Sequence, residues 1–439
     1  MPEYCLIGEK LGHSFSTFLH WEFGNPDYEL NEILKDKIDS YLQKADFKGI
    51  NVTIPYKETA MKYCIPDDTA KEIGCVNTLV NRNGKVFGYN TDCLGFSFMV
   101  RNAGISLSGK NILILGSGGT SKTACYQCAK EGAKSITVLS RTGKSYKSVV
   151  NCPVRFASYE DENLYDGIDI LVNTTPVGMF PDNNSSPVDI ELFENLEGVV
   201  DVVYNPLVTK LVNDARKRNI KATNGLSMLV SQAYYAEKLF QSDCGYELYN
   251  NNIEKINSED DDRIKLVLKR VIHSKRNYVL VGMPGSGKST IGRLLSEHLH
   301  LNFLDTDVLF KETFDSEPGD YITNYGEKEF RDKEALVVES AAQKSGTIIS
   351  TGGGSILRPS NVDALSANGI IIYLSRPINE LSVKNRPLSK NGNLRKLYDE
   401  RSPIYDRICD VKVEVAKTAR DTMAAVLEAV ENCNENFGY

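Results

Sequence analysis

No stretch of this 439-residue chain is apolar for anything near the roughly 20 residues that a helix needs to cross a bilayer. Basic residues are not in excess either, since 58 Asp and Glu outnumber 51 Lys and Arg and leave a net charge of −7. Nucleic acid and anionic membrane surfaces are therefore not expected as partners. The opening residues lack a basic segment followed by an apolar one, so we expect no secretory signal and a cytoplasmic location.

The chain also lacks a disulfide framework. Its ten cysteines are scattered along the sequence, which favours reduced thiols in the cytosol. Cys125 and Cys128 form a C-x-x-C pair, but no second pair completes a zinc site. Because the pair falls within a predicted helix, we expect both thiols on a buried helix face, with a redox or metal role as the weaker alternative.

What the chain does have is two glycine-rich loops, each between an apolar strand and a helix. The first spans 116–119 after a strand at 111–115, and the second spans 282–289 after a strand at 278–281. The second has the pattern G-x-x-x-x-G-K-S, whose backbone N–H groups cradle phosphates while the lysine reaches the β and γ oxygens and the serine ligates Mg²⁺. The sequence therefore predicts a dinucleotide reaction and an ATP reaction on one α/β chain.

A break in composition separates the two loops. Residues 250–262 are polar and acidic, which predicts a flexible connector. Residues 263–276 then read as a basic amphipathic helix, which we expect to pack on its own domain rather than on a membrane or a calmodulin-like partner. The expected domains are a substrate-binding lobe (1–98 plus 225–249), a dinucleotide-binding lobe (99–224), a linker (250–275) and a P-loop domain with a parallel sheet (276–439).

The first loop carries a cue to its cofactor. The strand at 135–139 ends at Ser140-Arg141-Thr142, where an NAD site would offer Asp or Glu to the ribose 2′-hydroxyl. Arg141, with Lys144 nearby, can instead pair with a 2′-phosphate. This favours NADP, and the alternative is an exposed basic turn without a ligand.

Several polar motifs lie outside this loop and indicate a substrate pocket. Hydroxyl, amide, amine and carboxylate groups come from Ser14, Ser16, Asn51, Thr53, Lys57, Asn77 and Asp92. Such a pocket suits a small polyhydroxylated acid. A Lys–Asp pair can hold and transfer the proton that accompanies hydride transfer at a carbonyl.

In their order along the chain, these motifs resemble shikimate dehydrogenase over about residues 1–245. The resemblance implies a two-lobed enzyme with a Rossmann-type NADP lobe, in which Lys57 is the catalytic acid or base and Asp92 its partner. It implies substrate binding by Ser14, Ser16, Thr53, Asn77, Asp92, Tyr204 and Gln232. It implies cofactor binding by Gly116, Ser117, Gly118, Gly119, Thr120, Ser140, Arg141, Thr142, Val202 and Gly225. Thr17 replaces the family's usual proline and Ser140 its usual asparagine, and both departures bear on affinity rather than on reaction type.

The P-loop alone leaves an NTPase switch, a nucleotide kinase and a sugar kinase open, but later residues narrow the choice. Asp305 and Asp307 end the next strand, where we expect both carboxylates on one face. Arg331 and Arg401 can clamp a carboxylate, although each arginine alone is more often in a surface ion pair. Thr351-Gly352-Gly353-Gly354 lets the backbone approach a ligand, and the segment around Arg386 is suited to a lid.

This second set resembles shikimate kinase over about residues 276–439. The resemblance implies that Asp307 contacts the acceptor hydroxyls and acts as base, and that Lys288 is catalytic. It implies shikimate binding by Asp307, Arg331, Gly353 and Arg401. ATP would contact Gly285, Ser286, Gly287, Lys288, Ser289, Thr290 and Arg386, and Mg²⁺ would contact Ser289 and Asp305. The lid segment is shorter than usual and lacks a second arginine, unless Lys384 substitutes for it.

The two resemblances are linked by chemistry, because reduction of 3-dehydroshikimate creates the hydroxyl that shikimate kinase phosphorylates. The sequence therefore predicts a bifunctional enzyme of aromatic amino-acid biosynthesis that uses NADP(H), ATP and Mg²⁺, with its oligomeric state left open. The rival hypothesis is a shikimate or quinate dehydrogenase with a non-catalytic, nucleotide-sensing P-loop domain. The acceptor-pocket residues argue against this rival, since a sensor needs none.

Overall fold

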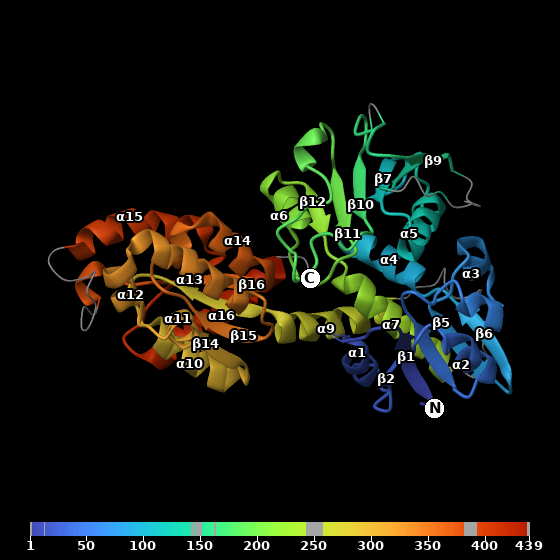
Figure 1. Ribbon diagram of the computed structural model, residues 1–439, viewed down its shortest axis with the longest axis horizontal. Coiled ribbons are helices and arrows are strands. Elements are labelled where there is room, and N and C mark those ends of the chain that lie inside the picture. Colours follow the sequence, from blue (N-terminus) through green and yellow to red (C-terminus); the bar gives the residue numbers. More distant parts are fainter. Residues whose placement is uncertain are drawn as a thin grey trace. The chain divides into compact units, whose positions relative to one another are not determined.

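The computed structural model describes residues 2–12, 14–141, 145, 152–161, 164–242, 258–381 and 393–436 (Figure 1). Its contacts divide the chain into two compact units. The first comprises Met1–Met179, Ser185–Tyr204 and Thr209–Lys269, and the second comprises Phe180–Asn184, Asn205–Val208 and Arg270–Tyr439. No helix within the described ranges is both long and apolar enough to cross a membrane.

The N-terminal lobe of the first unit is built on a mixed sheet of order β2-β1-β3-β5-β6-β4. Its strands are β1 (Tyr4–Gly8), β2 (Glu29–Glu32), β3 (Gly49–Val52), β4 (Ile65–Pro66), β5 (Thr78–Arg82) and β6 (Lys85–Tyr89). Its helices are α1 (Ser16–Glu22), α2 (Ile38–Lys44) and α3 (Asp68–Ile73), with a 3-10 turn η1 (Ala60–Tyr63). Asn83 and Gly84, both with positive φ, make the two-residue turn between β5 and β6, as Asn-Gly favours in hairpins.

The second sheet of the first unit is parallel throughout, with the order β12-β11-β10-β7-β8-β9. Its strands are β7 (Asn111–Leu115), β8 (Ser135–Leu139), β9 (Val154–Ala157), β10 (Ile170–Asn173), β11 (Gly198–Asp201) and β12 (Lys221–Thr223). Numbered from β7, this is the strand order 3-2-1-4-5-6 of the doubly wound dinucleotide-binding fold. The predicted Rossmann-type lobe is confirmed.

Helices cover both faces of this parallel sheet. They are α4 (Asp92–Asn102), α5 (Gly119–Lys130), α6 (Lys210–Lys217) and α7 (Leu226–Gln241), with a 3-10 turn η2 (Ile190–Leu192). Alternate residues of β7 join different cores: Ile112 packs in a cluster with residues of α4 and α5, and Leu113 in a cluster with residues of α6. Cys125 and Cys128 are 1% and 0% exposed in the first of these clusters, which confirms the buried helix face expected for the C-x-x-C pair.

Helix α9 (Ser258–Lys275) differs from the expected connector, because its first turn consists of the acidic residues. Asp260 is buried and accepts hydrogen bonds from Tyr234 at 2.6 Å and Lys238 at 2.9 Å, while Asp261 pairs with Arg101 at 2.7 Å. These partners and the positive helix N-terminus stabilise carboxylates in a helical turn. Where a flexible connector was expected, residues 258–262 instead form the start of a helix, whereas 243–257 lie outside the described residues. The apolar side chains of α9 are buried, as expected: Ile264, Val267, Leu268, Val271 and Ile272.

The second unit contains a five-stranded parallel sheet of order β14-β15-β13-β16-β17. Its strands are β13 (Asn277–Val281), β14 (Asn302–Asp305), β15 (Thr347–Ser350), β16 (Gly369–Ser375) and β17 (Val411–Glu414). Its helices are α10 (Lys288–Leu299), α11 (Thr306–Phe314), α12 (Pro318–Tyr325), α13 (Glu327–Ala342), α14 (Pro359–Asn368), α15 (Asn393–Ile408) and α16 (Ala419–Asn436), with 3-10 turns η4 (Ser355–Leu357) and η5 (Ile378–Glu380).

All five residues of the central strand β13 are buried. Val279 and Val281 pack in a cluster with residues of α13, α14 and α15, whereas Tyr278 and Leu280 pack in another with residues of α10 and α16. Since both faces are covered, polar groups gather beyond the strand ends, and the P-loop follows the carboxyl end of β13. The predicted parallel α/β fold of this part is also confirmed.

Candidate active sites

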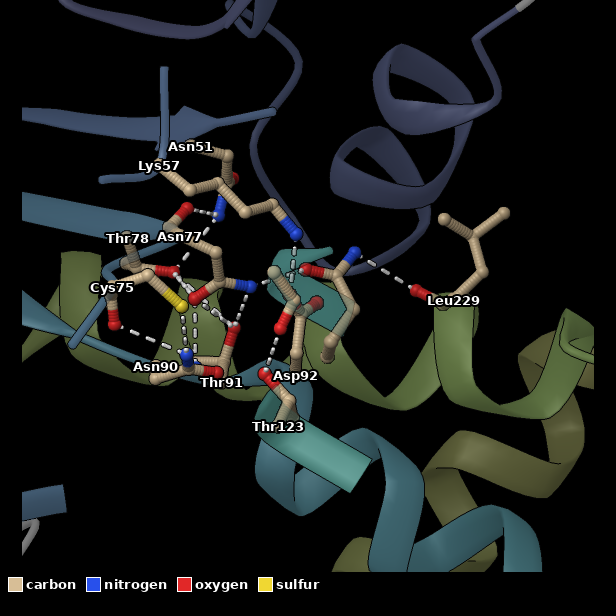
Figure 2. Close-up of polar contacts among 12 residues, drawn as sticks. Asn51, Lys57, Cys75, Asn77, Thr78, Asn90, Thr91, Asp92, Thr123 and Leu229 are labelled. Atoms are coloured by element: carbon tan, nitrogen blue, oxygen red, sulfur yellow. Dashed lines mark hydrogen bonds and ion pairs between the residues drawn. The ribbon is translucent and has the colours of Figure 1, made fainter. Parts of the chain in front are cut away.

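Lys57 and Asp92 form a close ion pair in the first unit. Lys57 follows the turn after β3, and Asp92 is the first residue of α4. Lys57 Nζ lies 2.5 Å from Asp92 Oδ2, and the side chains are 16% and 11% exposed (Figure 2). Burial lowers the pKa of Lys57, but attraction to the Asp92 carboxylate outweighs it and the net pKa is raised. At neutral pH the pair therefore contains a positioned ammonium group that has a proton to donate.

Asn77 organises the polar residues around this pair (Figure 2). Its Nδ2 donates to Thr91 Oγ1 at 3.0 Å and to Gln232 Oε1 at 3.4 Å, while its Oδ1 accepts from the Thr91 backbone N–H at 2.7 Å. Thr91 immediately precedes Asp92, and Gln232 lies on α7. The structure thus brings the predicted residues Asn77, Asp92 and Gln232 to one place.

Three buried side chains that sequence reasoning missed, Tyr28, His20 and Glu237, support Asn51 beside Asn77. The Tyr28 hydroxyl donates to Asn51 Oδ1 at 2.7 Å, and the His20 ring stacks on Tyr28 with 3.6 Å between ring centroids. His20 Nδ1 lies 2.6 Å from Glu237 Oε1. Burial lowers the pKa of His20. This group holds Asn51, whose Nδ2 donates to the Asn77 carbonyl at 3.3 Å. His20 and Glu237 lie 217 residues apart, so no local pattern signals the pair.

The two predicted serines also contact each other. Ser14 Oγ donates to Ser16 Oγ at 2.9 Å and accepts from the Ser16 backbone N–H at 3.2 Å. The ring of Phe15 between them meets Tyr204 edge to face, with centroids 6.5 Å apart. Thr53 is half-buried, and its backbone N–H donates to the Ile7 carbonyl at 2.9 Å.

The first glycine loop fits a dinucleotide pyrophosphate. Gly118 is the N-cap of α5 and Gly119 its first residue, so the loop lies at the positive helix end. A Cβ added at either glycine would meet no atom within 4 Å, which leaves the backbone open to a ligand. Ser117 and Thr120 flank this opening and are partly exposed. Beside Gly116 the space is closed, because a Cβ there would lie 2.8 Å from Thr174 Oγ1.

The remaining predicted cofactor residues fall into two groups. Ser140 is buried and Arg141 is exposed at the carboxyl end of β8, whereas Thr142 and Lys144 lie outside the described residues. Val202 and Gly225 are packed against each other, since a Cβ on Gly225 would lie 2.0 Å from the Val202 carbonyl oxygen. Only glycine allows this approach at the start of α7.

The P-loop of the second unit has the features of a phosphate cradle. Gly285 and Gly287 have φ of 87° and 98°, a conformation that favours glycine. Lys288 Nζ donates to the carbonyls of Gly282 at 2.9 Å and Met283 at 3.2 Å, so the ammonium folds back over its own loop. Ser286 Oγ is buried without a hydrogen-bond partner among the described residues. An orphaned donor and a lysine held inside the loop fit a phosphate group.

The residues expected to hold Mg²⁺ lie together beside this loop. Ser289 Oγ donates to Asp305 Oδ2 at 2.7 Å, which places two oxygen donors side by side, as Mg²⁺ sites require. Asp305 also caps α11, because its Oδ1 accepts from the Asp307 backbone N–H at 3.1 Å. Asp307 is therefore in the first turn of a helix. The expectation that both carboxylates lie on one face of a strand end was wrong. Thr290 is exposed on α10.

The three glycines of residues 352–354 gather the predicted acceptor-binding side chains. A Cβ on Gly352 would lie 2.8 Å from Asp307 Oδ1, and one on Gly354 would lie 2.4 Å from an Arg331 terminal nitrogen. The carbonyl of Gly353 accepts from Arg401 at 3.1 Å. Gly352 and Gly354 thus let Asp307 and Arg331 lie against the backbone, whereas a Cβ on Gly353 would meet Pro284 at 2.9 Å. Together the three residues bring Asp307, Arg331 and Arg401 to one loop.

The two arginines differ in their surroundings. Arg331 pairs with Glu334 at 2.7 Å and Glu327 at 3.1 Å, as the ion-pair alternative expects. Arg401 is only 6% exposed, and its Nε is buried with no hydrogen-bond partner among the described residues. A buried, unpaired guanidinium nitrogen fits an anionic ligand such as a carboxylate. Arg386 lies outside the described residues.

These features define a chain with two nucleotide-binding α/β enzyme units. Residues 6–79 match the family model of the shikimate dehydrogenase substrate binding domain, and residues 284–431 match that of shikimate kinase. A curated relative, the shikimate dehydrogenase (NADP(+)) of Clostridium beijerinckii, is 36% identical over 250 residues, which cover 55% of this chain and 92% of the relative. The chain belongs to the shikimate dehydrogenase family and carries a shikimate kinase domain after it.

Solved structures agree with this assignment for the first unit. The shikimate dehydrogenase 1 of Peptoclostridium difficile is similar with a TM-score of 0.51 and 34% identity, covering 62% of this chain and 99% of that one. A chorismate mutase/shikimate 5-dehydrogenase fusion protein from Clostridium acetobutylicum is similar with a TM-score of 0.51 and 32% identity, covering 61% of this chain and 97% of that one. The second relative is itself a fusion of two enzymes.

The contact between Gly225 and Val202 generates a test of the fold around the first cradle. Gly225→Ala forces the added methyl group against the Val202 carbonyl. Overpacking of this kind destabilises a folded protein by roughly 1–3 kcal/mol. We expect the free energy of unfolding of the first unit, measured with urea, to fall by that amount. Gly119→Ala is the matched control, since its methyl group enters open space at the first residue of α5, and it should not lower the free energy of unfolding. Equal stability of the two variants would contradict the close approach.

Proposed function

We propose that the chain catalyses two consecutive reactions: NADPH-dependent reduction of 3-dehydroshikimate to shikimate, and ATP-dependent phosphorylation of shikimate at its 3-hydroxyl. The single observation that carries the reduction is the partly buried Lys57–Asp92 pair at 2.5 Å beside the polar group around Asn77. The phosphorylation is supported by the Ser289–Asp305 contact and by the hydrogen bond from Arg401 to the Gly353 carbonyl in the glycine loop 352–354. Membership of the family and the kinase-family match support both assignments.

In the reduction, Lys57 donates a proton to the carbonyl oxygen of the substrate as hydride arrives at its carbon. NADPH supplies the hydride when it is bound. Asp92 keeps the Lys57 ammonium in place, because an opposite charge at 2.5 Å offsets the cost of burying it. Ser14 and Ser16 present hydroxyls to the substrate carboxylate, while Asn77, Thr53, Tyr204 and Gln232 contact its ring substituents.

In the phosphorylation, Asp307 accepts the proton of the shikimate hydroxyl as that oxygen attacks phosphorus. Arg401 and Arg331 bind the shikimate carboxylate, and the unpaired Arg401 Nε is the donor available to it. ATP, when bound, would supply the phosphoryl group: the bond between its γ-phosphorus and the β,γ-bridging oxygen breaks and ADP leaves. Lys288 and the P-loop backbone would stabilise the negative charge on the transferring group. Ser289 and Asp305, whose side-chain oxygens lie 2.7 Å apart, would hold the Mg²⁺ ion.

The acceptor loop distinguishes this proposal from the nucleotide-sensor alternative. A sensor domain needs the phosphate cradle but has no use for Asp307, Arg331 and Arg401 gathered on residues 352–354. The product of the first reaction also has the hydroxyl that the second reaction consumes. Both activities on one chain therefore form a sequence of two steps.

Replacing Lys57 tests the reductase assignment. Lys57→Ala removes the proton donor, and we expect the rate of NADPH oxidation with 3-dehydroshikimate to fall by roughly 10²- to 10⁴-fold. Phosphorylation of added shikimate should remain. Lys62→Ala removes an exposed lysine from the same segment and serves as the control. A near-normal reductase rate in Lys57→Ala would show that its catalytic role is wrong.

Replacing Lys288 tests the kinase assignment in the opposite direction. Lys288→Ala removes the cation next to the β and γ phosphates, so formation of shikimate 3-phosphate should fall by at least about 10²-fold while reduction continues. Lys417→Ala, an exposed lysine of the same unit, is the control and should retain both activities. Loss of both reactions in a folded Lys288→Ala protein would contradict separate sites.

Arg141 decides the cofactor preference in this account. Arg141→Ala removes a charge-assisted contact to the 2′-phosphate, which is worth roughly 1.5–3 kcal/mol, or about 10- to 100-fold in affinity for NADPH. Affinity for NADH, which has no such phosphate, should change little. Arg155→Ala removes another exposed arginine near the same sheet edge and should spare both cofactors. An equal loss for NADPH and NADH would show that Arg141 is structural.

A further inference from the structure

The side chain of Tyr405 connects the P-loop to the acceptor loop in the second unit. Its hydroxyl lies 2.9 Å from the carbonyl oxygen of Gly282 and 2.6 Å from that of Gly353. The Gly282 carbonyl also accepts from Lys288 Nζ at 2.9 Å, and the Gly353 carbonyl from Arg401 at 3.1 Å. A continuous chain of hydrogen bonds therefore runs from the lysine of the phosphate cradle to an arginine of the acceptor pocket.

This chain is shielded from water. Tyr405 is 0% exposed, Arg401 6% and Lys288 8%. The Tyr405 ring stacks on Tyr373 with centroids 5.0 Å apart and belongs to the hydrophobic cluster beneath β13. Burial raises the pKa of Tyr405, so its hydroxyl remains a neutral donor. Packing holds the ring, the Arg401 side chain also hydrogen-bonds to the hydroxyl, and turning the O–H changes which carbonyl receives its proton.

The hydroxyl has one proton and faces two carbonyl acceptors, so it can donate fully to only one of them at a time. Each carbonyl belongs to a different binding loop. When Lys288 Nζ turns toward phosphate oxygens, the Gly282 carbonyl loses one of the donors that the structure gives it. A buried carbonyl without a donor is costly, which favours donation by Tyr405 to Gly282. The Gly353 carbonyl then accepts from Arg401 instead, and this hydrogen bond holds the Arg401 guanidinium against the acceptor loop.

We propose that Tyr405 is a positioning residue that couples the two substrate sites of the kinase unit through the alternative acceptors of its hydroxyl. Nucleotide binding orders Arg401 for the acceptor, and by reciprocity the acceptor favours the loop conformation that binds nucleotide. The effect is a mutual increase in affinity of about five- to tenfold. This inference rests on the proposed kinase function, because it assigns phosphate to Lys288 and a carboxylate to Arg401.

Calorimetric titration of the full chain measures the coupling. The non-hydrolysable ATP analogue is titrated with Mg²⁺ in the absence and in the presence of saturating shikimate, because shikimate also binds the first unit whereas the analogue reports on the P-loop. The ratio of the two dissociation constants of the analogue is the coupling factor, which is the same from either ligand. We expect about five to ten for the unmodified protein. Tyr405→Phe, which keeps the ring and removes the hydroxyl, should bring the factor close to one. Its affinity for each ligand alone should stay within about threefold.

Tyr373→Phe is the matched control, because it removes the hydroxyl of the neighbouring stacked tyrosine, which lies 3.4 Å from Ser402 Oγ. Its coupling factor should equal that of the unmodified protein. A factor of one in the unmodified protein overturns the inference, and so does a Tyr405→Phe protein that retains the coupling or that loses each ligand measured alone. Failure of the unmodified protein to form shikimate 3-phosphate from added shikimate and ATP would instead reject the proposed kinase function.

Discussion

A parallel sheet covered by helices on both faces has polar groups available only at the ends of its strands, and both nucleotide sites of this chain depend on that constraint. The buried strands β7 and β13 each end at a glycine-rich loop followed by a helix, so backbone N–H groups and the helix dipole meet at one point. The same edge positions the reacting groups. Ser289 contacts Asp305 at the end of β14, and glycines 352–354 follow the end of β15 and contact the acceptor-binding side chains.

Much of this arrangement was predictable because local patterns encode it. A glycine loop between an apolar strand and a helix specifies both the fold and the position of the phosphate. Lys57 and Asp92 are 35 residues apart, and their pairing was expected from the resemblance to shikimate dehydrogenase and from the proton chemistry of a Lys–Asp pair. The C-x-x-C cysteines were correctly placed in the core, since a helix behind a phosphate loop must bury one face against its sheet.

The parts that could not be predicted depend on partners distant in sequence. From the local sequence, the acidic residues at the start of α9 are expected to be exposed to solvent. In the fold, Tyr234 and Lys238 donate hydrogen bonds to Asp260, and Arg101 pairs with Asp261. The strand predicted to end at Asp307 ends at Asp305, because the Asp305 side chain caps α11 and the helix begins at the next residue. No local pattern indicates the role of Tyr405 either, since its hydroxyl donates to the carbonyls of Gly282 and Gly353, which are 123 and 52 residues away.

One measurement tests most directly whether two consecutive reactions occur on this chain. The purified full chain is supplied with 3-dehydroshikimate, NADPH, ATP and Mg²⁺, and NADPH, ADP, shikimate and shikimate 3-phosphate are followed together. The account predicts that shikimate 3-phosphate accumulates and that ADP forms only when NADPH is present, with no more than one ADP for each NADPH oxidised. Oxidation of NADPH with accumulation of shikimate and no ADP would contradict it and would make the P-loop unit a nucleotide sensor.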